Sequence, residues 1–135
     1  MTQISIQDTL LNEQVTNWFN NYLYLGCGTS SSVTIGTETD LYTPKQIGAT
    51  AANRNKVSET GTTSAFVSDN VFVRLFKLTT IEPNVLPVNL RELGLHKTEA
   101  DNNDMGSRIV LNVNQTKDNT VAWNLRFQGR VSRLD

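Results

Sequence analysis

Residues 120–131 read TVAWNLRFQGRV and carry the clearest pattern in the chain. Apolar side chains occupy one parity of this stretch, with Gly129 as the gap: Val121, Trp123, Leu125, Phe127 and Val131. A period of two held over this length predicts a β-strand with one face on a core and the other in solvent. On the solvent side, Arg126 and Arg130, followed by Arg133, form a candidate interface for an acidic protein surface.

The residues before this strand predict its pairing partner. Residues 107–113 are rich in β-forming side chains, and the polar residues 115–119 supply a turn. We therefore expect residues 107–131 to form a long antiparallel β-hairpin.

Further strands are expected upstream. Residues 22–28 read YLYLGCG, a β-rich run stopped by glycine, and residues 64–69 also read as a strand. Residues 71–78 read VFVRLFKL, with apolar side chains on both faces, which favours a central position between two layers. Residues 88–96 form another strand, interrupted at Gly94. Strands at short spacing predict an all-β fold, an antiparallel β-sandwich of jelly-roll or related Greek-key type.

The N-terminal segment, residues 1–21, differs from the rest of the chain. One apolar stripe in it has helical spacing: Leu11, Val15, Trp18 and Tyr22. In contrast, Ile4 and Ile6 alternate with polar residues as in a strand, so both a short helix and an extended arm fit this segment. Trp18 and Phe19 are its candidate interface residues.

A second unusual segment spans residues 29–63, where Ser, Thr, Gly, Asn and Ala predominate. Such a stretch cannot build a core of its own, and structureless loops above about 12–15 residues are usually functional or mobile. We expect one or two short edge strands and a long polar loop that orders against something else, within a sandwich domain spanning residues 22–135.

The composition narrows the choice of function. The 135 residues include 12 Lys and Arg against 13 Asp and Glu, and the net charge of −1 gives no electrostatic reason to bind nucleic acid or an anionic membrane. No apolar run is long enough to cross a membrane, and residues 1–7 lack the features of a signal peptide. The single cysteine, Cys27, excludes an internal disulfide and a four-cysteine zinc site.

Three features of the sequence bear on catalysis or metal binding. His96 stands at the end of an expected strand, and we expect it on the surface because no local signature brings it a nucleophile. Cys27 lies between two glycines, where a small buried residue is expected rather than a reactive thiolate. The acidic residues 99–106 offer oxygen atoms but not the register of a calcium loop, so we expect a solvated loop. We therefore predict a protein that is not an enzyme and has no cofactor and no metal.

Four runs of sequence together resemble a known class of protein. Residues 89–96 read NLRELGLH, residues 107–111 read SRIVL, residues 123–127 read WNLRF, and residues 22–29 read YLYLGCGT. They are similar to small tailed-bacteriophage virion proteins, in which a hydrophobic-x-Glu-hydrophobic-Gly-Leu strand is followed by a strand carrying an Arg and by a closing strand. A Gly-x-Gly-Thr turn ends an early strand of those proteins. The resemblance covers about half of the chain and is strongest to jelly-roll capsid cement (decoration) proteins.

This resemblance implies a structural role. A cement protein would bind the major capsid protein on the capsid exterior as a homodimer or homotrimer, after assembly in the host cytoplasm. One alternative is a neck, tail or fibre-associated virion protein. An alternative from another class is a carbohydrate-binding β-sandwich that stacks sugars on Trp or Tyr.

Overall fold

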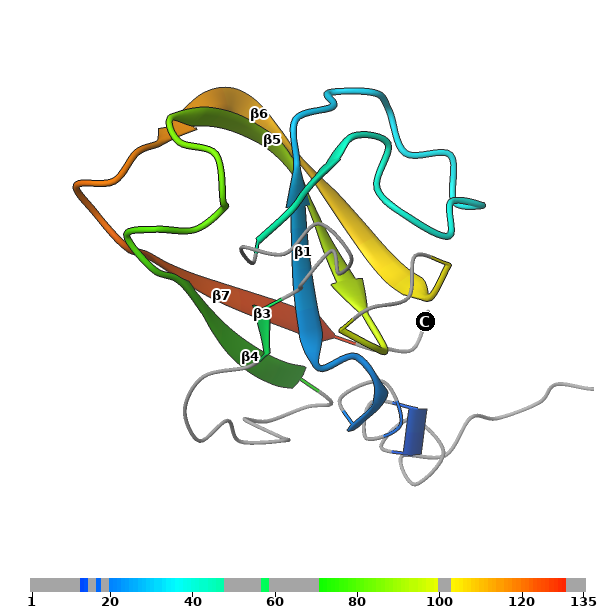
Figure 1. Ribbon diagram of the computed structural model, residues 1–135. Helices are drawn as coiled ribbons and strands as arrows, with labels where there is room; N and C mark the ends of the chain where they lie inside the picture. The colour runs from blue at the N-terminus through cyan, green and yellow to red at the C-terminus, as the bar shows by residue number, and fades with distance from the viewer. Residues whose placement is uncertain are drawn as a thin grey trace, which may run out of the picture.

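The fold consists of short and long antiparallel strands (Figure 1). The computed structural model describes residues 13–14, 17, 20–47, 57–58, 71–99 and 103–130. The strands are β1 (Tyr24–Gly28), β2 (Pro44–Lys45), β3 (Val57–Ser58), β4 (Val71–Leu78), β5 (Val88–His96), β6 (Met105–Lys117) and β7 (Trp123–Arg130). The all-β prediction is confirmed. Within the segment 1–21, the described residues Glu13, Gln14, Asn17, Asn20 and Asn21 are helical.

The strands form two sheets around one core. The main sheet has the order β2-β1-β5-β6, and β3 also pairs with β1, whereas β4 and β7 pair with each other in the second sheet. Buried apolar side chains from both sheets form the core: Leu25, Cys27, Ile47, Phe76, Leu78, Leu90, Leu93, Leu95 and Phe127. The arrangement is that of a β-sandwich. The seven strands of the described residues are one fewer than the eight of a jelly roll.

The alternating pattern of the last strand is confirmed. Phe127 is buried and packs edge-on against Phe76, with ring centroids 5.7 Å apart, while Trp123 and Leu125 pack against the same core. Arg126 faces outward. Val121 lies before β7 and is 51% exposed, so the apolar stripe begins two residues later than expected.

The hairpin expected over residues 107–131 is wrong. Strand β6 pairs with β5, and β7 pairs with β4, so the two strands of the expected hairpin lie in different sheets. The polar residues 115–117 do not turn but continue β6 by pairing with residues 88–90. Lys117 is fully buried there, and its Nζ donates hydrogen bonds to the carbonyl oxygens of Thr79 and Asp118, which moves the turn to residues 118–122.

Two details of the other strands also differ from expectation. Strand β4 buries apolar side chains on both faces only near its start: Val73 is buried on the face opposite to Phe76 and Leu78, whereas Leu75 and Lys77 farther along the face of Val73 are exposed. Strand β5 is continuous through Gly94, which pairs with Gly26 of β1. The strand expected over residues 64–69 lies outside the described residues.

Candidate functional site

The outer face of the main sheet is lined by glycine. Because Leu25 and Leu93 point into the core, the alternate residues Gly26, Gly28 and Gly94 lie on the opposite face of β1 and β5. A Cβ on Gly94 would lie 2.9 Å from His96 Nε2 and within 3.0 Å of Leu41. The absence of side chains at these positions therefore lets residues 29–43 lie directly on the sheet.

A buried ion pair stands on this glycine-lined face. Arg108 of β6 donates through Nε to Glu92 Oε2 of β5 at 2.9 Å, and both side chains are almost completely buried. A charge removed from water costs several kcal/mol unless it has a partner and further hydrogen bonds. The further hydrogen bonds of Glu92 and of Arg108 therefore show which segments this ion pair holds in place.

Glu92 binds the backbone of the returning end of the segment. Its Oε1 accepts a hydrogen bond from the Thr43 amide at 2.7 Å, and its Oε2 accepts one from the Tyr42 amide at 3.1 Å. Gly28 makes this approach possible, since a Cβ there would collide with Glu92 Oε1 and with the Thr43 carbonyl oxygen. The Thr29 amide also donates to that carbonyl.

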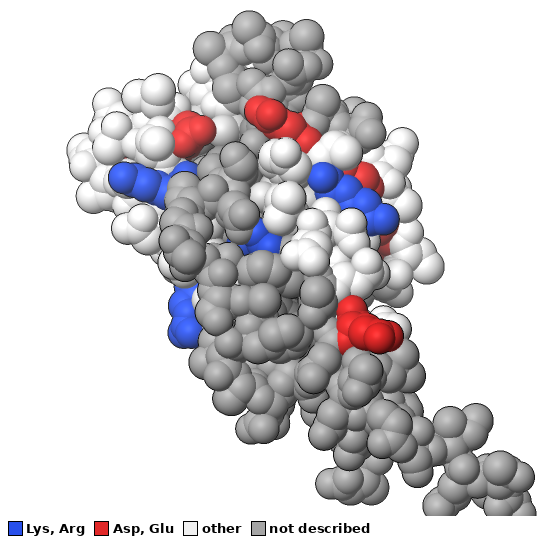
Figure 2. Space-filling view, turned by 90° about the horizontal axis from the view of Figure 1, so that it is seen from below, with Lys and Arg blue, Asp and Glu red and all other residues white. Residues whose placement is uncertain are grey.

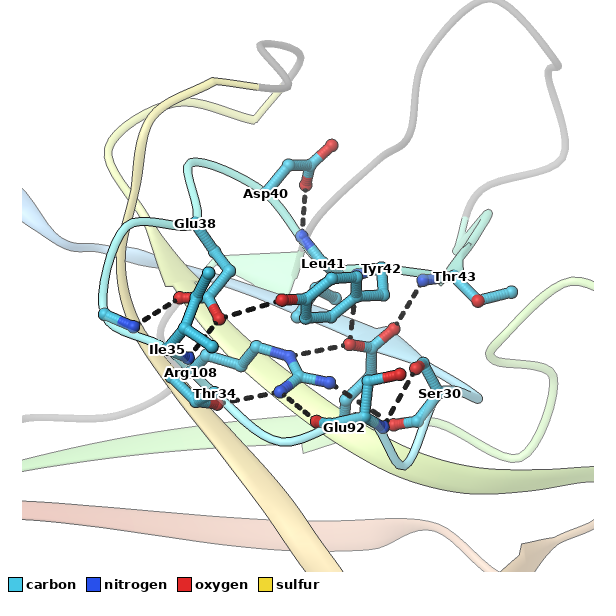
Figure 3. Close-up of polar contacts among 12 residues, drawn as sticks. Ser30, Thr34, Ile35, Glu38, Asp40, Leu41, Tyr42, Thr43, Glu92 and Arg108 are labelled. Atoms are coloured by element: carbon cyan, nitrogen blue, oxygen red, sulfur yellow. Dashed lines mark hydrogen bonds and ion pairs between the residues drawn. The ribbon is translucent and has the colours of Figure 1, made fainter.

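Arg108 binds the outgoing end of the same segment (Figure 3). Its Nη1 donates to the Ser32 carbonyl oxygen and to Thr34 Oγ1, both at 2.7 Å. The guanidinium lies 4.6 Å from the centroid of the Tyr42 ring, a cation–π contact. Together, the two buried charges fasten both arms of the loop spanning residues 29–43, which we name the docking loop.

Glu38 closes the far end of the docking loop. Its carboxylate accepts hydrogen bonds from the amides of Ile35 and Gly36 and from the Tyr42 hydroxyl, at 2.6, 2.9 and 3.0 Å. Gly36 has φ +92°, a conformation that glycine adopts without strain. The backbone hydrogen bond from Ile35 is the main reason that the pKa of Glu38 falls to about 2, and the bond to Glu38 raises the pKa of Tyr42.

The fixed loop carries exposed apolar side chains at its tip. Val33 is 80% exposed and Ile35 is 72% exposed. Residues 29–43 order on the outer face of their own sheet, which differs from our expectation that the polar segment orders against something else. Residues 44–45 join the sheet as β2, and Ile47 enters the core. Two short strands, β2 and β3, do occur within the segment 29–63, as expected.

The position of His96 contradicts the prediction of a surface histidine. Its side chain is completely buried on the glycine-lined face, and its Nδ1 lies 3.0 Å from Asp104 Oδ1. The ring fits there because Gly26 and Gly94 leave room beside it. Asp104 also accepts hydrogen bonds from the amide and hydroxyl of Thr98, so the one described carboxylate in the stretch 100–106 serves the loop between β5 and β6.

Cys27 is buried in the core, as expected. Burial, with a smaller effect from the charges of Glu82 and Glu92, raises the pKa of its thiol to about 12. The thiol therefore stays protonated at neutral pH and is not placed to act as a nucleophile.

The interface residues expected from the sequence do not coincide with this site. Arg126 is exposed on the outer face of β7, in the sheet that does not carry the docking loop, and only the backbone of Arg130 is described. Trp18, Phe19 and Arg133 lie outside the described residues.

Sequence reasoning missed the role of Glu92 and Arg108, although both lie in the runs that carry the resemblance. The signal was present in the pattern. Glu92 has the same parity as Gly94 and the opposite parity to Leu93 and Leu95, which marks a charged group on a face lined by glycine.

The described residues show no further clustering of charges on the face in Figure 2 and no group of metal ligands. In Figure 2, the basic and acidic side chains of the described residues are scattered over the visible face. Those residues contain no cluster of three or more potential metal ligands of the His, Cys, Asp and Glu types, and no helix among them is long and apolar enough to cross a membrane. Comparisons of the chain with protein-family models, curated proteins and solved structures gave no match.

Proposed function

We propose that this chain is a non-enzymatic structural protein of a tailed-phage virion, a cement protein that attaches to the capsid shell through its docking loop. One observation carries the proposal: buried charges fix a loop whose tip exposes Val33 and Ile35. Fixing a loop by a buried ion pair is costly in desolvation, and exposed aliphatic side chains gain nothing in the free protein. Both features make physical sense if the tip contacts another protein.

The docking loop is suited to repeated weak contacts. Because its backbone is already held by Glu92 and Arg108, binding does not require further ordering of the loop. Burying Val33 and Ile35 completely would contribute at most about 2–4 kcal/mol, from the usual 1.5–3 kcal/mol per aliphatic side chain and their exposure. Such an affinity is weak for one copy, and attachment to a repeating shell supplies avidity.

The partner in this proposal is the major capsid protein on the capsid exterior. The low charge of the chain supports it, since contacts with few ions lose little strength when the salt concentration changes. A neck, tail or fibre position uses the same loop, and copy number separates the two, because a cement protein is present in hundreds of copies and a tail part in a few to a few dozen. The carbohydrate-binding alternative finds no support at Trp123, which packs against the core.

Cosedimentation with purified shells that lack this protein tests the proposal. We expect saturable binding by the native chain and binding at least tenfold weaker by the double variant Val33→Ser/Ile35→Ser. Val85→Ser is the matched control, because Val85 is 73% exposed on a different loop. Absence of saturable binding by the native chain would remove the cement role, and quantitative mass spectrometry of virions would then show whether the chain occurs in the low copy number of a tail part.

A further inference from the structure

The outer face of the β4–β7 sheet carries a small basic surface. The register places Leu75 opposite Arg126 and Lys77 opposite Asn124, and all four side chains are exposed. Among the described side chains on this face of the two strands, none is a carboxylate. Two positive charges therefore flank an apolar residue, Leu75, that is 37% exposed.

A shallow groove lies within this basic surface. Its volume is about 220 Å³, and its lining combines apolar and polar residues: Leu75, Phe76, Asn124, Leu125 and Arg126. A groove of this kind can receive an aliphatic side chain while Arg126 and Lys77 meet carboxylates beside it.

The docking loop has the complementary chemistry. Residues 29–43 contain Glu38 and Asp40 and no Lys or Arg. Arg108 beneath the loop is neutralised by Glu92, so it does not offset the charge of Glu38. The tip of the loop thus presents Ile35 beside the Glu38 carboxylate, which matches the apolar groove beside two cations.

The two complementary surfaces lie on opposite sides of the molecule. The docking loop covers the outer face of β1 and β5, and the β4–β7 sheet lies beyond the core, as Figure 1 shows. The loop of one copy therefore cannot reach its own β4–β7 face, and a two-fold dimer cannot form both contacts at once. Contacts between unlike surfaces lead to head-to-tail assemblies, which close into rings when the rotation allows.

From this geometry we propose that the docking loop of one copy binds the outer β4–β7 face of a second copy, head to tail. The inference rests on the proposed function of the loop as a protein-docking element and assigns a second copy of this chain as its partner in the free protein. Self-association and attachment to the shell would then compete for the loop tip, because both contacts bury Val33 and Ile35.

Sedimentation velocity on the full chain and two variants tests this arrangement. One variant, Val33→Ser/Ile35→Ser, removes the apolar tip, and the other, Lys77→Glu/Arg126→Glu, reverses the charge of the β4–β7 face. We expect the native chain to form assemblies larger than a dimer and each variant alone to be monomeric. Mixing the two variants should give a 1:1 dimer and nothing larger, because the mixture retains one intact pair of surfaces. Val85→Ser should assemble like the native chain, and circular dichroism should show all variants folded.

Several outcomes would overturn the inference. A native chain that stays monomeric at high micromolar concentration contradicts it, and so does assembly that survives either double variant. A mixture that contains only monomers would also contradict it. These results are independent of the shell-binding assay: a monomer that binds shells removes only the ring, whereas a ring that does not bind shells removes only the cement role.

Discussion

Replacing Arg108 by methionine should destabilise the protein more than any ordinary surface substitution. In the native chain, Glu92 is fully buried and accepts hydrogen bonds from Arg108 and from the amides of Tyr42 and Thr43. The variant keeps the volume of the side chain but leaves the Glu92 carboxylate buried without a counter-charge. Breaking a buried pair from one side costs about 3–5 kcal/mol.

Arg108→Met should also disorder part of the docking loop. Arg108 also donates to the Ser32 carbonyl and to Thr34 Oγ1, so Arg108→Met releases the outgoing arm of the docking loop. Against a total stability of about 5–15 kcal/mol for a domain, the change is large enough to measure without ambiguity. Urea denaturation followed by circular dichroism gives the free energy of unfolding.

A matched control and a double-mutant cycle separate the pair from general packing. Arg91 is half-buried in β5, where its Nε donates to the Leu111 carbonyl, so Arg91→Met should cost only about 0.5–1.5 kcal/mol. Glu92→Gln and Arg108→Met combined should lose less than the sum of the two single changes, by up to about 3 kcal/mol. If Arg108→Met costs no more than Arg91→Met, or if the two changes add, the pair does not hold the loop.

Four further predictions follow from neighbouring contacts. Gly28→Ala should lower the free energy of unfolding by about 1–3 kcal/mol, because the Cβ of the alanine would collide with Glu92 Oε1. An unchanged midpoint of urea denaturation would show that this contact is absent. Glu38 has a pKa of about 2 against an ordinary value of 4.5, so its contribution to stability is present above pH 4.5 and is lost as the pH falls towards 2. NMR chemical shifts of the docking loop that titrate near pH 4.5, and not near pH 2, would contradict the lowered pKa. Cys27, with a pKa of about 12, should not react with iodoacetamide at pH 8 unless the chain is unfolded, and rapid labelling of the native protein would refute its burial. Lys117→Met should cost about 1–3 kcal/mol, since it removes the hydrogen bonds of Lys117 to the Asp118 carbonyl oxygen and to the Thr79 carbonyl oxygen, which keeps only the Glu82 amide as a donor. Thermal unfolding at the native midpoint would count against that role.

The sequence predicted the strands better than it predicted their pairing. The period of two around Phe127 identified β7 and its buried face, because alternation depends on only local chain geometry. Pairing depends on contacts between distant segments, and residues 115–117 looked like a turn because their side chains are polar. Lys117 continues β6 nevertheless, since its amine finds two carbonyl oxygens inside the fold.

The candidate site could be predicted only in part from the sequence. The runs around Glu92 and Arg108 were noticed as a resemblance, but nothing local says that two charges on different strands meet at 2.9 Å. Glycine is a second signal, because within a strand it can indicate either a break or room for a neighbouring group. Gly94 does not interrupt β5; its missing side chain makes room for Leu41 and His96 above the sheet.

Amide hydrogen exchange of the free protein tests the central claim most directly, namely that the docking loop is already fixed before any partner binds. We expect the amides of Tyr42 and Thr43, which donate to Glu92, to exchange as slowly as those of the main sheet. In Arg108→Met, protection of these two amides should fall while that of Leu93 in the core remains. Exchange of Tyr42 and Thr43 at the rate of an unstructured chain in the native protein would contradict the account.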